Sequence, residues 1–168
     1  MPITLFIVRH ARAEDRATFM ADHDRELTPE GIIAAARVGR YLHKKNICPD
    51  VIISSTAPRA RDTANVVAEQ VGFDPAQIQL EASLYDGGPK AYLSAINTLP
   101  VSVQSAMIVG HNPDVSYFGE FLTHQSIGSM SKGAVVAVTF GNLGWAEVSG
   151  RTGSLLFQIA PKTLPAEE

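Results

Sequence analysis

Two histidines in this chain closely follow apolar runs, where an imidazole can take part in chemistry. One residue separates His10 from the apolar run 3–8, and one residue separates His111 from the run 106–109. An unprotonated imidazole acts as a nucleophile when a hydrogen bond holds its other nitrogen. We interpret His10 as a nucleophile that attacks phosphorus. The alternative is a histidine that only makes a capping hydrogen bond at a strand end.

Arginines near these positions suit the charge of a phosphoryl group. During transfer that charge is spread over three oxygens, and a guanidinium group binds two of them at once. Arg9 precedes His10, and Arg59 lies in the first turn of a helix predicted to begin at Pro58. A cation there opposes the helix dipole unless an anion lies in front of it. We therefore predict that Arg9 and Arg59 bind phosphate.

Two neighbouring residues have plainer alternatives. His111 stands between a strand and a helix start, so it either joins the site or only closes the turn. Arg61 lies two residues after Arg59 and is expected on another face of the helix. There it would be solvated or paired with Asp62 or Glu81.

The elements that would position these residues can be read from hydrophobic patterning. Apolar runs of strand length occupy residues 3–8, 50–54, 106–109, 134–140 and 155–159. Helical patterns occupy residues 29–45, 58–71 and 91–99 and the stretch after Asn112-Pro113. Nearly continuous apolar strands alternating with helices favour a parallel sheet covered on both faces.

This order predicts an α/β fold: a single three-layer domain with a mostly parallel central sheet and helices on both faces. The fourth and fifth strands would form a C-terminal antiparallel hairpin. We expect the domain to span residues 1–160 and residues 161–168 to be a frayed tail. Because ligands of such folds bind beyond the carboxyl ends of the strands, the histidines and arginines are expected to converge at one sheet edge.

The overall composition restricts the possible partners. The chain has 168 residues, a net charge of -3 and a single cysteine, Cys48. This balance argues against a nucleic-acid-binding or membrane-surface protein, and the single cysteine favours a reduced, cytoplasmic setting. The longest N-terminal apolar run is too short to span a membrane. No metal-ligand spacing or P-loop occurs, so we expect no metal and no cofactor.

Four motifs in order resemble those of the histidine phosphatase superfamily, also called phosphoglycerate mutase-like. That family has Arg-His near its N-terminus, then Leu-Thr-x-x-Gly, Ser-x-x-x-Arg-x-x-x-Thr and a late Gly-His. The corresponding residues are Arg9-His10, Leu27-Thr28-Pro29-Glu30-Gly31, Ser55 with Arg59 and Thr63, and Gly110-His111. The resemblance covers about residues 3–125, and Ala11 stands where the family usually has glycine.

The resemblance implies roles for these residues. His10 would accept the phosphoryl group, and Arg9, Arg59 and His111 would form the pocket that binds it. The chain most resembles the short SixA-type phosphohistidine phosphatases, which have an arginine two residues before the Leu-Thr pair. Arg25 occupies that position and is a candidate phosphate ligand, or else a solvated loop arginine.

The general acid is the least determined part of the predicted site. Esterases of the family use a carboxylate from a segment that follows the third strand of the family fold and corresponds here to residues 81–88. Asp86 is the nearest candidate there, and Glu81 is expected to be structural. Expelling an alkoxide needs protonation, whereas the imidazole of phosphohistidine leaves more easily. A site with several phosphate-binding residues but no clear general acid therefore favours a phosphohistidine substrate.

The predicted substrate is phosphohistidine on a signalling protein. Only residues 86–100 could cover the pocket, and a shallow pocket suits a phosphorylated side chain presented by another protein. One alternative is a small-molecule phosphomonoesterase that takes small phosphate esters and uses Asp86 as its acid. Another is a catalytically silent phosphate-binding module, against which the intact histidine pairs argue.

Overall fold

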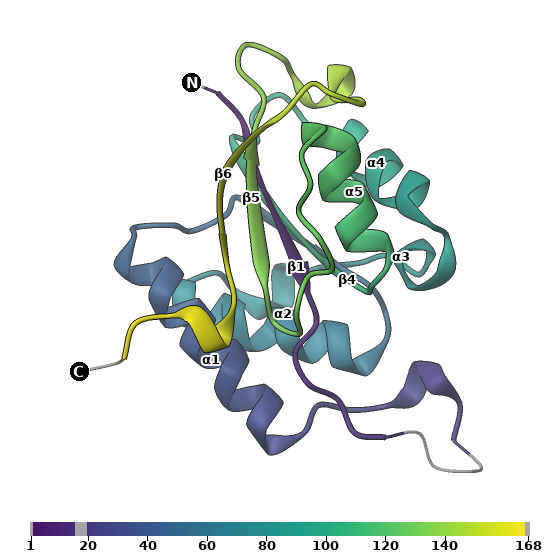
Figure 1. The fold of residues 1–168 in the computed structure, drawn as a ribbon, viewed down its shortest axis with the longest axis vertical. Coiled ribbons are helices and arrows are strands. Elements are labelled where there is room, and N and C mark those ends of the chain that lie inside the picture. The colour runs from purple at the N-terminus through teal and green to yellow at the C-terminus, as the bar shows by residue number, and fades with distance from the viewer. Residues whose placement is uncertain (1, 16–19, 167–168) are drawn as a thin grey trace.

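The computed structural model describes residues 2–15 and 20–166 and shows a six-stranded sheet in the order β3-β2-β4-β1-β5-β6 (Figure 1). The strands are β1 (Thr4–Arg9), β2 (Val51–Ser54), β3 (Gln79–Leu80), β4 (Ser105–Gly110), β5 (Val135–Thr139) and β6 (Ser154–Ile159). Strands β1 to β4 are parallel, β5 is antiparallel to β1, and β6 is antiparallel to β5. The predicted mostly parallel sheet and its C-terminal antiparallel pair are confirmed.

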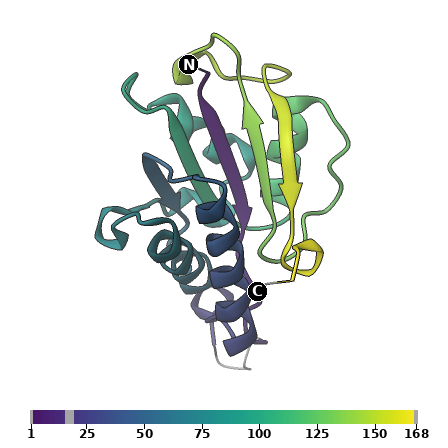
Figure 2. The same cartoon turned by 90° about the vertical axis from the view of Figure 1, so that its left-hand side faces the viewer.

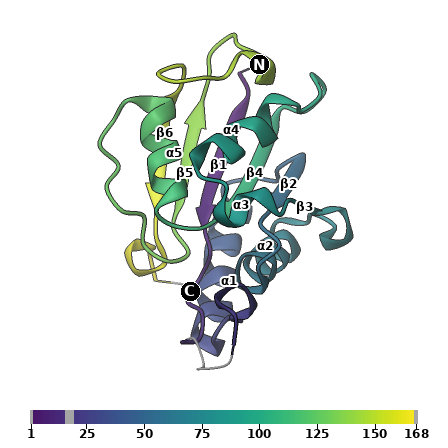
Figure 3. The same cartoon turned by 90° about the vertical axis from the view of Figure 1, so that its right-hand side faces the viewer.

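Helices cover both faces of the sheet. They are α1 (Pro29–Lys44), α2 (Pro58–Val71), α3 (Ser83–Asp86), α4 (Pro89–Asn97) and α5 (Asp114–Thr123). Short 3-10 turns are Asp22–Asp24, Pro75–Gln77, Trp145–Glu147 and Pro161–Thr163. Helices α1 and α2 lie against one face (Figure 2), and α3, α4 and α5 lie against the other (Figure 3).

Strand β1 shows why this sequence makes a three-layer structure. Leu5 and Ile7 pack into the apolar cluster beneath α4 and α5, while Phe6 and Val8 pack into the cluster beneath α1 and α2. Successive side chains of a strand point to opposite faces, so a continuous apolar run supplies both cores. All four side chains are at most 4% exposed.

The three central parallel strands end in register. Arg9 pairs with Gly110, and Ser54 pairs with Val109. Just beyond the strands, the backbone N–H of His10 donates to the carbonyl oxygen of Gly110 at 3.0 Å. The backbone of Ser55 likewise donates to Val109 at 3.0 Å. The chain therefore leaves β1, β2 and β4 at one edge of the sheet, as predicted.

Two elements do not appear in the sequence prediction. Strand β3 has only two residues, both exposed, so no apolar run marks it. Helix α3 is a single turn with one buried residue, Leu84, in a stretch whose glycines indicate a loop. Helix α4 begins at Pro89 rather than residue 91, directly after Gly88 at φ 75°. Elements this short are specified by tertiary contacts more than by periodicity.

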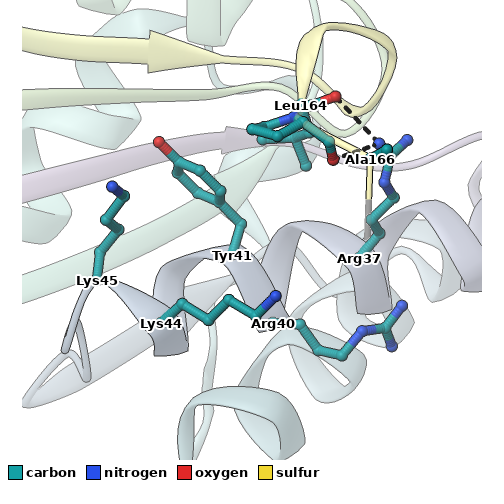
Figure 4. A pocket seen from close by; sticks show the side chains of 8 residues that line it. Arg37, Arg40, Tyr41, Lys44, Lys45, Leu164 and Ala166 are labelled. Atoms are coloured by element: carbon teal, nitrogen blue, oxygen red, sulfur yellow. Dashed lines mark hydrogen bonds between the residues drawn. The ribbon is translucent and has the colours of Figure 1, made fainter. Parts of the chain in front are cut away.

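The C-terminal residues that the structure describes lie against α1. Arg37 donates hydrogen bonds to the carbonyl oxygens of Pro161 and Pro165. It also donates to the carbonyl oxygen of Leu164 (Figure 4). Glu167 and Glu168 lie outside the described residues, and the domain boundary at residue 160 stays a prediction. Among the described helices, none is both long and apolar enough to cross a bilayer.

Tyr92 joins α4 to the strand edge that carries His111. Its side chain is fully buried, and its hydroxyl accepts from the backbone N–H of His111 at 3.1 Å and donates to the carbonyl of Leu84 at 2.8 Å. A Cβ at position 110 would collide with this hydroxyl, so only glycine permits the approach.

We predict that Tyr92→Phe lowers the free energy of unfolding by about 1–3 kcal/mol, because two buried polar groups lose their partner. Urea unfolding measures the change. Tyr117→Phe is the matched control, since that ring is 58% exposed. Equal stability of the Tyr92→Phe and unaltered proteins would contradict the role given to the hydroxyl.

Candidate active site

A pocket of about 310 Å³ lies at the carboxyl ends of β1, β2 and β4. Its lining residues are Arg9, His10, Ala13, Asp22, Arg25, Arg59, His111, Asn112 and Lys132. The structure thus brings together five of the six residues predicted from sequence. They come from the ends of β1 and β4, the start of α2 and the loop before α1.

The hydrogen bonding of His10 fixes which of its nitrogens can react. Its Nδ1 lies 2.7 Å from the carbonyl oxygen of Ala11. A carbonyl can only accept, so Nδ1 must carry the hydrogen and Nε2 keeps its lone pair in the neutral ring. His10 is 6% exposed and lines the pocket. Its Nε2 is therefore the nucleophilic atom that the local structure prepares.

The environment keeps His10 neutral. The pKa of its imidazole is lowered to about 4, chiefly by burial. The charges of Arg59 and Arg9 lower this pKa further, whereas the hydrogen bond to Ala11 raises it. Desolvation and nearby cations both disfavour the imidazolium form. The ring is therefore unprotonated at neutral pH, as a nucleophile requires.

His111 packs beside His10 with ring centroids 5.2 Å apart. Its Nε2 lies 2.8 Å from Oγ of Ser55, which also accepts from the backbone N–H of Ala57. In the tautomer in which the Ser55 hydroxyl donates to Nε2, the histidine hydrogen lies on Nδ1, which is buried without a partner among the described residues. An oxygen of a bound anion can accept it. Burial, and then the charge of His10, lower the pKa of His111 to about 3, so it donates as a neutral ring.

The arginines form the cationic wall of the pocket. Arg59 is only 4% exposed, and its Nη1 and Nη2 donate to the carbonyl and carboxylate oxygens of Asp22 at 2.8 and 3.0 Å. Nη1 of Arg9 donates to the carbonyl of Met130 at 2.9 Å. Within the part of the chain that the structure describes, the buried Nε atoms of both arginines have no hydrogen-bond partner. Buried donors without acceptors are rare, and a bound oxyanion would supply them.

The serine, arginine and threonine motif lies along one face of α2 and its preceding turn. Residues four apart share a helix face, which explains the spacing. Ser55 contacts His111, Arg59 enters the pocket, and the Oγ1 of Thr63 accepts from the backbone N–H of Ala11 at 3.0 Å. The hydroxyl of Thr63 also donates to the carbonyl of Arg59 at 2.7 Å. This face therefore braces the nucleophile loop.

The Leu-Thr-x-x-Gly motif anchors the loop that carries Arg25. Thr28 accepts from the backbone N–H of Gly31 at the start of α1, and its own N–H donates to the carbonyl of Arg12. A Cβ on Gly31 would collide with that carbonyl. Nη1 of Arg25 donates to the carbonyl of Glu14 at 3.2 Å, which holds the predicted arginine in the pocket lining.

The structure does not bring Asp86 into this group. It ends α3 with an exposed side chain and is not among the pocket-lining residues. Glu81 is exposed and accepts from the hydroxyl of Ser83 at 3.3 Å. Arg61 pairs with Asp62 at 3.1 Å, one of the alternatives open from sequence.

Sequence reasoning missed four residues of the site. Asp22, Asn112 and Lys132 line the pocket, and Tyr85 donates to Oδ2 of Asp22 at 2.6 Å. The ring of Tyr85 also meets that of His111 edge-on at 5.3 Å. Asn112 directly follows the Gly-His pair and had a positional signal. The other three have none, because only the folded loops bring them together.

Comparison with known proteins identifies the family. The sequence model of the histidine phosphatase superfamily (branch 1) matches residues 5–86. A chloroplastic protein of Arabidopsis thaliana is 30% identical over 157 residues, which cover 89% of this chain and 72% of that protein. The chain belongs to the histidine phosphatase superfamily. The resemblance in the sequence motifs is thereby confirmed.

Solved structures show the same histidine phosphatase fold. A SixA protein of Nakamurella multipartitia superposes with a TM-score of 0.80 at 26% identity, covering 96% of this chain and 97% of that one. A SixA protein of Agrobacterium tumefaciens gives 0.81 at 26% identity, covering 96% and 99%. Both are proposed phosphohistidine phosphatases. Family and neighbours together support phosphatase activity.

We predict that His10 stays neutral down to mildly acidic pH in the free protein and titrates near its lowered pKa of about 4. Saturation with inorganic phosphate should raise this pKa, because the anion offsets the arginine charges that lower it. NMR of the imidazole nitrogens measures both, with His10→Gln used to assign the signal. Protonation of His10 near its ordinary pKa of about 6.5 in the free protein would contradict the account.

Proposed function

We propose that this protein is a phosphohistidine phosphatase that works through a phosphorylated His10. The observation that carries the proposal is an imidazole whose Nδ1 is held by the carbonyl of Ala11, which leaves the lone pair on Nε2, inside an arginine-lined pocket. A nucleophile of this kind needs no metal or nucleotide to attack phosphorus. The SixA structural neighbours support the choice of phosphohistidine as substrate.

In the first step, the lone pair of His10 Nε2 forms a bond to phosphorus. The bond from phosphorus to the substrate nitrogen breaks, and its electron pair stays on that nitrogen. Arg9, Arg25 and Arg59 hold the phosphoryl oxygens, and Nδ1 of His111 donates to one of them. Charge develops on these oxygens in transfer, so prepositioned cations and donors lower the barrier.

In the second step, water attacks the phosphorus of phospho-His10. The bond between phosphorus and Nε2 breaks, its electron pair returns to the imidazole, and inorganic phosphate leaves with the oxygen of water. The ring is then neutral with its hydrogen on Nδ1, and the hydrogens of water stay on the phosphate, which leaves as dihydrogen phosphate or passes one proton to solvent. The carbonyl of Ala11 keeps Nδ1 as the donor throughout, so Nε2 is regenerated as the nucleophile.

The acid–base character of the pocket favours a nitrogen leaving group. Asp22 is the one carboxylate among the described lining residues. Its pKa is lowered, chiefly because Tyr85 donates to it, so it is not a proton donor near neutral pH. An alkoxide needs such a donor, whereas an imidazole leaves without one. Asp86 stays a candidate acid only for the esterase alternative, from a position outside the pocket lining.

The pocket also suits a phosphate group presented by a protein. The nucleophile is nearly buried, while Asp22 at the pocket is 44% exposed and Lys132 is exposed. A phosphorylated side chain can enter while the rest of its protein stays outside. We therefore propose a histidine-phosphorylated signalling protein as the partner and infer a cytoplasmic setting from the single cysteine, Cys48.

Turnover of a histidine-phosphorylated protein, measured beside a panel of alkyl and aryl phosphate esters, tests this proposal. We expect the phosphoprotein to be preferred in kcat/KM. His10→Ala should lose activity by a factor on the order of 10³ or more, as when a nucleophile is removed. The variant should still bind phosphate through the arginines. Undiminished turnover by His10→Ala, or a preference for alkyl esters, would contradict the proposal.

Arg59→Ala and Arg61→Ala form a matched pair on one helix. The first removes a buried cation from the pocket, so kcat/KM should fall by on the order of a hundredfold. The second removes an arginine paired with Asp62 outside the pocket, so kcat/KM should change little. Steady-state kinetics of both variants measure the difference. Similar losses in the two variants would show that the pocket assignment is wrong.

A further inference from the structure

Asp22 places a carboxylate in a pocket otherwise lined by cations and neutral groups. The 3-10 turn Asp22–Asp24 carries it to the lining beside His10 and His111. Its Oδ1 lies 3.0 Å from Nε of Arg25, and its Oδ2 accepts from Arg59 at 3.0 Å and Tyr85 at 2.6 Å. Such a carboxylate repels a phosphoryl dianion, so binding of phosphate alone does not explain it.

The charge on Asp22 is fixed by its partners. The hydrogen bond from Tyr85 and the charges of Arg59 and Arg25 lower the pKa of the carboxyl, although burial opposes them. Asp22 is therefore a permanent anion near neutral pH, and it acts as an acceptor and a negative charge.

The position of Asp22 matches the direction of the leaving group. Attacking and leaving atoms lie roughly in line through phosphorus. His10 is 6% exposed and lies deep in the pocket, so the leaving group must point away from it toward solvent. The side chain of Asp22 is 44% exposed, which places the carboxylate nearer the mouth than the nucleophile. A carboxylate in the same lining, with a more exposed side chain, is placed to contact a group that departs toward solvent.

We propose that Asp22 is a specificity-determining residue that binds the protonated imidazole ring of the substrate and so selects a cationic leaving group over an ester. The inference rests on the proposed function and names how the site would choose that substrate. The ring carries a hydrogen on the nitrogen not bonded to phosphorus, and the carboxylate accepts it. When the bond to phosphorus breaks, the electron pair stays on the ring, which leaves as neutral imidazole.

The test compares N-phosphoimidazole, whose leaving ring can be protonated, with nitrophenyl phosphate, whose leaving group is an anion. In Asp22→Asn, we expect the ratio of the two kcat/KM values to fall about tenfold or more toward the ester, the effect of losing a charge-assisted hydrogen bond. The alkaline limb of the phosphoimidazole pH profile should also move to lower pH, because the carboxylate no longer stabilises the protonated ring.

Asp24→Asn is the matched control. It removes a carboxylate from the same turn that contacts His23 and is not in the pocket lining. We expect its substrate ratio to equal that of the unaltered protein. Asp22→Glu should restore part of the ratio that Asp22→Asn loses.

The outcomes separate the two proposals. Equal loss on both substrates in Asp22→Asn, with an unmoved pH profile, overturns the inference and leaves Asp22 as a support for the arginines alone. An equal ratio change in Asp24→Asn also overturns it. If the unaltered protein hydrolyses the ester but neither phosphoimidazole nor a histidine-phosphorylated protein, the proposed function itself fails.

Discussion

The hydrogen bond from the backbone of His10 to the carbonyl of Gly110 joins the ends of two parallel strands, and the site is built outward from it. It keeps β1 and β4 in register up to their last residues, so the histidines that follow leave the sheet together. Strand β2 ends beside them through the bond from Ser55 to Val109. The Ser55 side chain then holds His111, and α2 begins where Arg59 can enter the pocket. Loss of this register would separate the nucleophile from its clamp.

Desolvation and charge cooperate in this pocket. Burial is the largest cause of the lowered pKa of both imidazoles, and the charge of Arg59 lowers both pKa values further. The same cations that bind an oxyanion therefore also preserve the lone pair of His10. Burying the arginine cations costs desolvation free energy, and their contacts with backbone carbonyls and with Asp22 limit that cost. A bound phosphoryl group would satisfy the donors that these contacts leave without partners.

The sequence is sufficient to predict the three layers of the fold and the principal residues of the candidate phosphate pocket. Apolar runs mark the three central strands β1, β2 and β4 and the C-terminal pair β5 and β6. The first four of these are largely buried, and β6 alternates between half-buried and exposed residues. The motif spacing identifies His10, Arg9, Arg59 and His111, because each lies directly at a strand end or helix start.

Asp22 and Tyr85 could not be predicted in this way. They are 63 residues apart, and their contact depends on the conformation of two irregular segments. No periodicity or cap marks such a contact. The position of Asp86 shows the converse, since a carboxylate in a plausible sequence position ends on the exposed side of a one-turn helix.

In the proposed mechanism His10 accepts the phosphoryl group. The most direct measurement is to quench the protein during turnover of a labelled phosphorylated substrate, under alkaline conditions that preserve phosphohistidine, and to locate the label by peptide mass spectrometry. The account predicts one phosphorylated residue, His10, which appears and decays at the rate of turnover and is absent from His10→Ala. Turnover without a phosphorylated His10, or with the label on another residue, would contradict it.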